Sequence, residues 1–461
     1  MTLKGKKVGF DTGAGYAKLH YIKKPIKIFR GCMGAGKTYA TLHALSENTQ
    51  TIFIAERLEA VSSAIRDCKH MIEVEAKPTK TDHLKELLLS GKSVVCTHSL
   101  FRLLKSDIIA IIEDRGIELI IDELLESTVE VRGTMQDEEG CCISSGLRAM
   151  LHASNAIGIE EDTGRVYWNS SFPSPVGCGG TLEDIYHWCQ AGVLFWYNTR
   201  VEDLSGFVVT AFPFRLLEAF KSVSMLCYGF DGLPMQAYLD LFEIPYIYDN
   251  RFLDGESEHL SNLKLKVNFL KDTVIHKTID KISKRSFQGK ELTFSLTCWQ
   301  NMKYEDVREI GAKMDGYLRS NKITGSKALW TVYKDFRDEV AKGFKKEFLN
   351  KYGEDNISEA RKGTCKTFAS WNLKGTNEYK DRELMMLMVS PNIHPDLFSF
   401  FRSRGIELDK DSYKLEMTRQ WIMRGCARDK SSDRIMDVLV ASKEVQRLLE
   451  KWINGELINS N

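Results

Sequence analysis

The sequence predicts an α/β protein with parallel sheets, because of three features of its 461 residues. Short apolar runs alternate with helix-like segments. The runs are continuously apolar, so helices should cover both faces of each sheet. A glycine-rich loop and an acidic pair each follow such a run, and ligands bind at the carboxyl ends of strands in sheets of this kind.

The apolar runs give the order of the elements. Strands are expected at 26–29, 51–55, 93–97, 119–121, 223–227, 328–332 and 384–389. Helices are expected at 39–45, 56–68, 100–104, 214–220 and 235–242. The tail from Tyr413 to Ile458 has a helical pattern. The stretch from Asp249 to Ser261 is acidic and rich in turn-forming residues, so it is interpreted as a linker.

Changes in composition divide the chain into three parts. Residues 1–25 are interpreted as a hairpin-like extension, 26–262 as the first domain and 263–461 as the second. Between about 130 and 206, turns rich in Gly, Ser, Pro and Cys alternate with aromatic patches. This texture indicates a small, partly β subdomain inserted in the first domain.

The aromatic residues of the insertion have two interpretations, as the core of the small subdomain or as a surface that stacks on unpaired bases. They are Trp168, Phe172, Tyr186, Trp188, Phe195, Trp196 and Tyr197. A zinc site is disfavoured because no C-x₂-C pair is present. Its candidate ligands would be Cys141, Cys142, Cys178, His187 and Cys189.

Composition and charge restrict the class of protein. Hydrophobic residues make up 43% and charged residues 28% of the chain, which is typical of a soluble globular protein. No apolar stretch could span a bilayer, and the first residues lack an apolar signal core, so no membrane partner is expected. The 11 cysteines show no paired framework and are expected to be reduced thiols in the cytoplasm.

The net charge is only +1, but it is unevenly distributed. Residues 263–346 hold 19 Lys or Arg against 10 Asp or Glu, a surplus of nine. Such a local surplus fits contact with a phosphate backbone, and it equally fits an ordinary solvated helical surface.

Residues Gly31 to Thr38 match the phosphate-binding pattern G-x-x-x-x-G-K-[ST], with a predicted strand before and a helix after it. Gly31, Gly34 and Gly36 would let backbone N–H groups surround the phosphates. Lys37 is expected to reach the β- and γ-phosphates, and Thr38 to hold Mg²⁺ through its hydroxyl. ATP and Mg²⁺ are therefore the predicted cofactors.

Asp122 and Glu123 end a predicted buried strand, 85 residues after Lys37. This is the arrangement of the acidic pair in nucleotide hydrolases. Asp122 is expected to bind the Mg²⁺, directly or through water. Glu123 is expected to orient and deprotonate the attacking water.

Taken together, these features resemble superfamily 2 helicases. Residues 122–125 stand where that superfamily has its D-E-x-x box, and 55–57 and 97–100 stand where it has loops that touch the nucleic-acid backbone. The resemblance thus implies nucleic-acid contacts for Arg57, Thr97 and His98.

Two segments of the second half add to the resemblance. Residues 372–379 look like the fifth helicase motif, in the G-T-N-x-Y form of phage- and plasmid-borne members. This match implies strand contacts for Gly375, Thr376 and Asn377. Lys334, which follows a predicted strand, is a further candidate for a phosphate-backbone contact.

Residues 420–428 look like the sixth helicase motif. Gln420, Arg424 and Arg428 are spaced i, i+4 and i+8, so a helix would place all three on one face. The resemblance implies that Gln420 contacts the triphosphate, that Arg428 is the arginine finger and that Arg424 is its partner. The two arginines are four residues apart, where the most familiar form has three.

The third helicase motif has two candidates, 208–212 and 226–231. The second is preferred because it ends a strand that follows one predicted helix and precedes another, which suits a core sheet.

The resemblance implies two RecA-like domains in tandem that form an ATP-driven helicase or translocase. Its expected partner is single-stranded or forked DNA, in phage-type replication or recombination in the cytoplasm of a bacterial host. Three alternatives remain: an ATPase that remodels duplex or branched DNA without processive unwinding, a replication-origin-binding protein, and a small-molecule kinase. The kinase is least favoured because it needs no distant segment with Gln420, Arg424 and Arg428.

Overall fold

The structure is a computed structural model, and it divides the chain into two compact units. The described residues are 25–56, 58–104, 106–125, 128–132, 145–161, 163–197, 207–254, 256–323, 327–344, 367–372, 378–429 and 433–457. The first unit contains the strand before residue 31, residues 38–249 and residues 393–409, and the second contains 31–37, 250–392 and the chain from 410 onward. The sequence predicts a single boundary near residue 262. The structure differs from it at three segments, 31–37, 250–262 and 393–409. The proposed extension lies outside the described residues, apart from Pro25.

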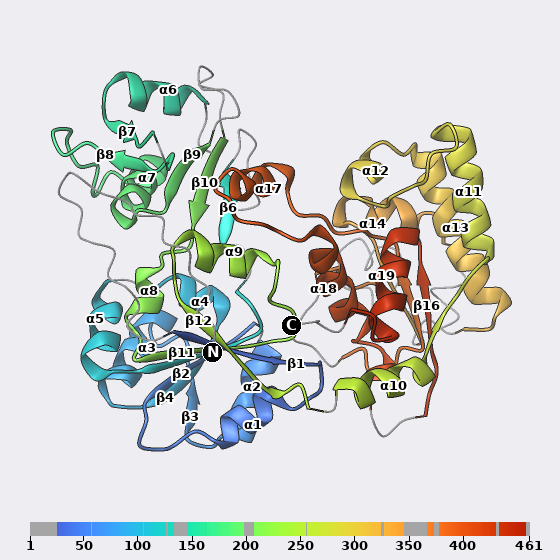
Figure 1. The fold of residues 1–461 in the computed structure, drawn as a ribbon, viewed down its shortest axis with the longest axis horizontal. Helices are drawn as coiled ribbons and strands as arrows, with labels where there is room; N and C mark the ends of the chain where they lie inside the picture. The colour runs from blue at the N-terminus through green and yellow to red at the C-terminus, as the bar shows by residue number, and fades with distance from the viewer. Residues whose placement is uncertain are drawn as a thin grey trace. The chain divides into compact units, whose positions relative to one another are not determined.

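The first unit is built on a seven-stranded sheet in the order β12-β1-β11-β5-β2-β4-β3 (Figure 1). Its strands are β1 (Ile26–Gly31), β2 (Thr51–Ala55), β3 (Met71–Glu73), β4 (Ser93–Thr97), β5 (Glu118–Asp122), β11 (Ser222–Cys227) and β12 (Tyr246–Phe252). Along the sheet from β1 through β11, β5, β2 and β4 to β3, every pair of neighbouring strands is parallel. The predicted α/β class with a parallel core sheet is confirmed.

Helices and loops of the first unit connect these strands. The helices are α1 (Lys37–His43), α2 (Leu58–Asp67), α3 (Lys80–Leu89), α4 (His98–Arg102), α5 (Ser106–Arg115), α8 (Arg215–Glu218) and α9 (Pro234–Leu241). The strands β2 and β4 are buried along almost their whole length, as continuously apolar runs require.

The predicted linker at 249–261 lies where the chain passes from the first unit to the second, after Asp249, but most of it has regular structure. Its first residues belong to β12, and Glu256–Lys266 forms α10. β12 is at the edge of the sheet, and its residues are exposed or half-buried. An edge strand tolerates Asp, Asn and Arg, which is why its sequence looks like a loop.

The insertion is a small subdomain of the first unit. Its elements are β6 (Val129–Arg132), α6 (Ser145–Ala153), β7 (Ile157–Ile159), β8 (Val166–Trp168), α7 (Gly180–Ala191), β9 (Leu194–Tyr197) and β10 (Phe207–Ala211). β6, β10 and β9 form an antiparallel sheet, and β7 pairs with β8. The later helix α17 (Pro395–Arg402) lies against β6 (Figure 1).

Most aromatic residues of the insertion form its core. Trp168, Phe195 and Trp196 are buried, and the two tryptophans pack with Ile185 and Cys189. Tyr186 and Trp188 are half-buried and pack against this core, Tyr197 is half-buried, and Phe172 is the most exposed of the seven, at 37%. The core interpretation of these residues is therefore confirmed for the buried ones.

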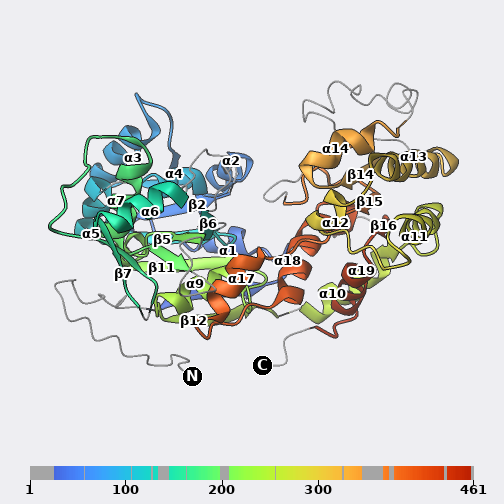
Figure 2. The ribbon, with the colours of Figure 1, turned by 90° about the horizontal axis from the view of Figure 1, so that it is seen from above.

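The second unit contains a four-stranded parallel sheet in the order β13-β16-β15-β14. The strands are β13 (Val267–Phe269), β14 (Ala328–Thr331), β15 (Leu384–Leu387) and β16 (Met436–Val440). Its helices are α10, α11 (Val274–Ser286), α12 (Leu296–Gln300), α13 (Tyr304–Ser320), α14 (Lys334–Ala341), α18 (Lys410–Ile422) and α19 (Lys443–Ile453). Helix α13 packs against both α11 and α14 (Figure 2).

The predicted helical tail at 413–458 is confirmed in part: α18 and α19 are helical, but the strand β16 lies between them. The strand is a short apolar run that is buried between β13 and β15. A run of this length fits a helix and a buried strand equally well by pattern alone. Among the described helices, none has the length and apolar character needed to cross a bilayer.

Candidate functional site

The glycine-rich loop between β1 and α1 has a backbone that requires glycine at the predicted positions. Gly34 and Gly36 have φ angles of 77° and 80°, in the left-handed region. At Gly31, an added Cβ would lie 2.5 Å from the Cβ of Phe252 and 2.7 Å from its carbonyl oxygen. A side chain would strain the backbone at Gly34 and Gly36 and would collide with Phe252 at Gly31, so glycine is favoured at all three positions.

Lys37 folds back over its own loop. Its Nζ donates hydrogen bonds to the carbonyl oxygens of Gly31, at 2.5 Å, and of Cys32, at 3.0 Å. The ammonium group therefore lies inside the curve of the loop, where its predicted contact with phosphate oxygens requires it.

Thr38 and Asp122 meet although they are 84 positions apart in the chain. The Thr38 hydroxyl donates to Asp122 Oδ1 at 2.8 Å. In the part of the chain that the structure describes, no group of three or more His, Cys, Asp or Glu is arranged to hold a metal ion. A hydroxyl and one carboxylate suit Mg²⁺, which keeps several waters and takes further oxygens from phosphates.

Glu123 has a strained backbone directly after β5. Its φ is 67°, although it carries a side chain, and its N–H donates to Leu226 O at 2.9 Å. A left-handed residue of this kind costs about 1–3 kcal/mol and persists where the surrounding structure imposes it. The turn directs the Glu123 side chain away from the course that a continued strand would give it.

The strand β11 lies between β1 and β5, and it carries one candidate for the third helicase motif. Leu226 is paired with Asp122, and Cys227 with Arg30. The segment 226–231 therefore begins beside the ends of β1 and β5, which carry the glycine-rich loop and the acidic pair. The other candidate, 208–212, lies mainly in β10 of the small antiparallel sheet. The topology supports the preference for 226–231.

A side-chain contact between Asp231 and Arg30 joins the segment 226–231 to the residue before the glycine-rich loop, and no sequence pattern predicts it. The buried Arg30 donates to Asp231 Oδ2 at 3.0 Å, and its guanidinium lies 4.1 Å from the ring centre of Tyr248. The Tyr248 hydroxyl also donates to Asp231. Burial and the bond to the Asp231 carboxylate together raise the pKa of Tyr248.

Thr97 and His98, two candidates for nucleic-acid contacts, both form hydrogen bonds within the protein. The Thr97 hydroxyl oxygen accepts from Leu100 N and caps α4. His98 is only 8% exposed, and its Nε2 lies 3.2 Å from the carbonyl oxygen of Asp122. His98 therefore contacts the backbone of the acidic pair. Arg57 lies outside the described residues.

The remaining nucleic-acid candidates belong to the second unit. Lys334 is the first residue of α14, shortly after β14, and it is exposed. Gly375, Thr376 and Asn377 lie outside the described residues.

Most ion pairs of the basic region 263–346 are internal to it, such as Arg285 with Asp306 and Arg308 with Glu339, and the surplus of nine already counts their acidic partners. Two pairs with acids outside the region reduce the surplus, Lys327 with Glu383 and Lys271 with Glu450. Among the described residues, these pairs leave most of the surplus positive charge in place.

The prediction that one helix carries Gln420, Arg424 and Arg428 is wrong. Helix α18 ends at Ile422, Arg424 lies in the following turn, and Arg428 ends a 3-10 helix at Cys426–Arg428. The backbone at Gly425 is extended, with φ −75° and ψ −174°, so the helical path does not continue through it. A Cβ there would meet Met436 Sδ and would lie 3.1 Å from Arg382 O, so glycine suits this close approach to β16.

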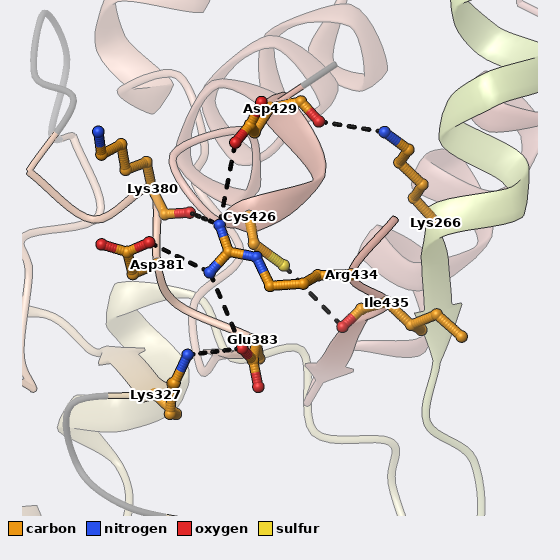
Figure 3. Close-up of polar contacts among 9 residues, drawn as sticks. All are labelled: Lys266, Lys327, Lys380, Asp381, Glu383, Cys426, Asp429, Arg434 and Ile435. Carbon is orange, nitrogen blue, oxygen red and sulfur yellow. Dashed lines mark hydrogen bonds and ion pairs between the residues drawn. The ribbon is translucent and has the colours of Figure 1, made fainter. Parts of the chain in front are cut away.

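Polar contacts hold the turn that carries Arg428 (Figure 3). Cys426 N donates to Arg382 O at 2.9 Å. The guanidinium of Arg434 lies 3.1 Å from Asp381 Oδ1 and 4.0 Å from Asp429 Oδ2, and Lys266 Nζ donates to Asp429 O at 3.1 Å. The hydrogen bond to Asp381 raises the pKa of Arg434. These groups fix the residues on both sides of Arg428.

Glu416 is a further residue that sequence inspection missed. It lies one turn before Gln420 on α18 and is 2% exposed. Its spacing of four residues from Gln420 is a signal that sequence alone offers.

Comparisons with known proteins found one family model and several similar proteins. Residues 269–453 match the family model described as the YonV C-terminal Rossmann-like domain, and this region contains β14, β15 and β16 of the four-stranded parallel sheet. The chain is 23% identical over 447 residues to the SPbeta prophage-derived uncharacterized protein YonV of Bacillus subtilis (strain 168). The match covers 94% of this chain and 99% of that relative.

Solved structures similar to this chain include XPD proteins. One is XPD in its apo form, with 12% identity, a TM-score of 0.49 and coverage of 95% of this chain and 96% of that chain. Another is Xpd4 of S. tokodaii, with 12% identity, a TM-score of 0.44 and coverage of 94% of each chain.

Proposed function

We propose that this protein is an ATP-dependent helicase or translocase that acts on nucleic acid, with DNA as the preferred polymer. ATP and Mg²⁺ are its proposed cofactors. The observation that carries the proposal is the hydrogen bond between Thr38 and Asp122, at 2.8 Å. It brings together the end of a phosphate-binding loop and the acidic end of a buried parallel strand, which is the pair that holds Mg²⁺ in P-loop nucleotide hydrolases.

The residues around this bond divide the work of hydrolysis between them. Gly31, Gly34 and Gly36 would give the phosphates access to backbone N–H groups. Lys37 would neutralise charge on the β- and γ-phosphates. Asp122 and Thr38 would hold the Mg²⁺, whose chemistry is to neutralise charge on the phosphate oxygens when it is bound.

Glu123 is the proposed general base. Its backbone turns sharply after β5, directly beyond Asp122, and its carboxylate would accept a proton from the attacking water. His98 holds the carbonyl of Asp122 and is proposed to position this turn.

Three residues of the second unit complete the proposed machinery. Gln420 would orient groups at the γ-phosphoryl, and Arg424 and Arg428 would neutralise the charge that develops on it. Thr97, Lys334, Arg57 and the segment 375–377 are the proposed contacts to the phosphate backbone. Binding should then be largely independent of sequence and sensitive to salt.

The test is ATP turnover by the full chain, measured in parallel with no polymer, single-stranded DNA, forked DNA and RNA. The proposal expects turnover that rises with DNA, and strand displacement on the forked substrate. A rate of ATP turnover that none of the polymers changes would contradict the proposal and would favour a small-molecule kinase. DNA-stimulated turnover without strand displacement would instead identify a remodelling ATPase.

Sequence preference separates the remaining alternative. A replication-origin-binding protein would select one DNA sequence, and that preference would survive Lys37→Ala. If the protein is a helicase or translocase, Lys37→Ala should bind DNA weakly and without sequence preference, and it should have no ATP turnover.

A further inference from the structure

Helix α18 buries an unusual set of charged side chains. Lys414, Glu416 and Arg419 are 7%, 2% and 9% exposed. Buried charges are costly unless they are paired and hydrogen-bonded, so each of them is expected to have a specific partner.

The two carboxylate oxygens of Glu416 have different partners. Oε2 accepts a hydrogen bond from Arg419, three residues on, and Oε1 accepts from Gln420 Nε2, four residues on, at 2.5 Å. Both are the side-chain neighbours that helical spacing allows. The carboxylate therefore joins a buried cation to the amide of Gln420.

This contact determines which end of the Gln420 amide faces Glu416. An ionised carboxylate only accepts hydrogen bonds, so the NH₂ end must face it, and the carbonyl oxygen Oε1 must face away. Within the described residues, Gln420 Oε1 is buried and has no hydrogen-bond partner. Such an oxygen is suited to accept from a hydroxyl or a water molecule.

We infer that Glu416 is a positioning residue that holds Gln420 with its carbonyl oxygen presented to a donor at the nucleotide. This inference rests on the proposed function, since Gln420 is assigned to the triphosphate there. Glu416 contributes by fixing the amide of Gln420, and it does not itself contact the nucleotide. Glutamine at this position can accept in one orientation and donate in the other, and the carboxylate selects the accepting one.

The chain offers a matched control, a carboxylate of α19 that pairs with a buried cation of α18. Glu444 Oε1 lies 2.7 Å from the Nζ of the buried Lys414, and this pair is separate from Gln420. Glu416→Gln and Glu444→Gln each remove one carboxylate that pairs with α18. Only the first removes the group that orients Gln420, because a glutamine at 416 accepts either end of the amide.

The experiment is a double-mutant cycle on DNA-stimulated ATP turnover. Glu416→Gln should lower kcat about tenfold with KM for ATP changed less than about twofold, while Glu444→Gln leaves both unchanged. In a Gln420→Ala background, Glu416→Gln should have no further effect on kcat, because the group it positions is gone. If Gln420→Ala has no measurable turnover, the test is whether Glu416→Gln alone lowers kcat while KM for ATP stays nearly unchanged.

Equal losses of kcat in both backgrounds, or no loss in either, would overturn the inference. A melting curve for each variant separates positioning from folding, and if Glu416→Gln melts early the cycle is repeated with Glu416→Asp. The proposed function fails by a different result, a wild-type chain without ATP turnover. If the wild type hydrolyses ATP and Glu416→Gln has the same kcat, the inference about Glu416 is wrong and the proposed function still holds.

Discussion

The two segments assigned to ATP are built in different ways. In the loop at 31–38, the backbone follows from glycines with positive φ, and Lys37 bonds to carbonyl oxygens of the same loop. In the segment at 420–428, the backbone follows from distant residues: Gly425 passes Met436, and Cys426 bonds to Arg382. A local pattern suffices to predict the first segment, whereas the second depends on its tertiary surroundings.

Lys37→Ala is the strongest test of the first segment, and it should leave no measurable ATP turnover. The substitution removes the one ammonium group that the loop holds inside its curve. The control is Lys27→Ala, because Lys27 is exposed on β1 just before the loop and should be dispensable. Retained turnover in the Lys37 variant, or equal loss in both, would separate the loop from hydrolysis.

Arg428→Ala tests the second segment and should lower kcat by about 10³-fold, the usual contribution of an arginine finger. Nucleotide binding, followed by fluorescence of a labelled ATP analogue, should persist because the loop at 31–38 is intact. Arg447→Ala is the control, since Arg447 is an exposed arginine of the same unit. A loss of less than about threefold would show that the finger lies elsewhere.

The same contrast explains what the sequence predicts. The strands at 51–55 and 93–97 match β2 and β4 residue for residue, because buried parallel strands are apolar on both faces. The edge strand β12 and the strand β16 were missed, since exposure gives the first a polar sequence and the second is a short apolar run between two helices, a run that fits either structure. The spacing of Glu416 from Gln420 suggests their contact, but the burial of Glu416 and the contacts of Arg434 depend on tertiary structure that spacing does not reveal.

Gly425→Ala sharpens the comparison by testing packing alone. The added methyl group collides with Met436 Sδ and crowds Arg382 O, so it should destabilise the fold by about 1–3 kcal/mol in urea unfolding. Gly316→Ala is the matched control. Gly316 lies in α13 with open space around its Cβ position, so alanine should be neutral or stabilising there. Equal stability of the two variants would show that the turn has room for a side chain.

Arg434→Gln should have the smallest effect, because the Arg434 side chain is 31% exposed and its partners Asp381 and Asp429 are 63% and 36% exposed. Exposed ion pairs contribute little, and salt screens them. The melting temperature should therefore fall slightly in low salt and match the wild type at about 1 M salt, where the Debye length is only about 3 Å. At low salt kcat should fall as well, because Arg434 restrains Asp429 beside Arg428, whereas Arg447→Gln should change neither. A loss of kcat that persists in high salt would mean that the turn at 426–428 depends on the geometry of the Arg434 hydrogen bonds rather than on their charge.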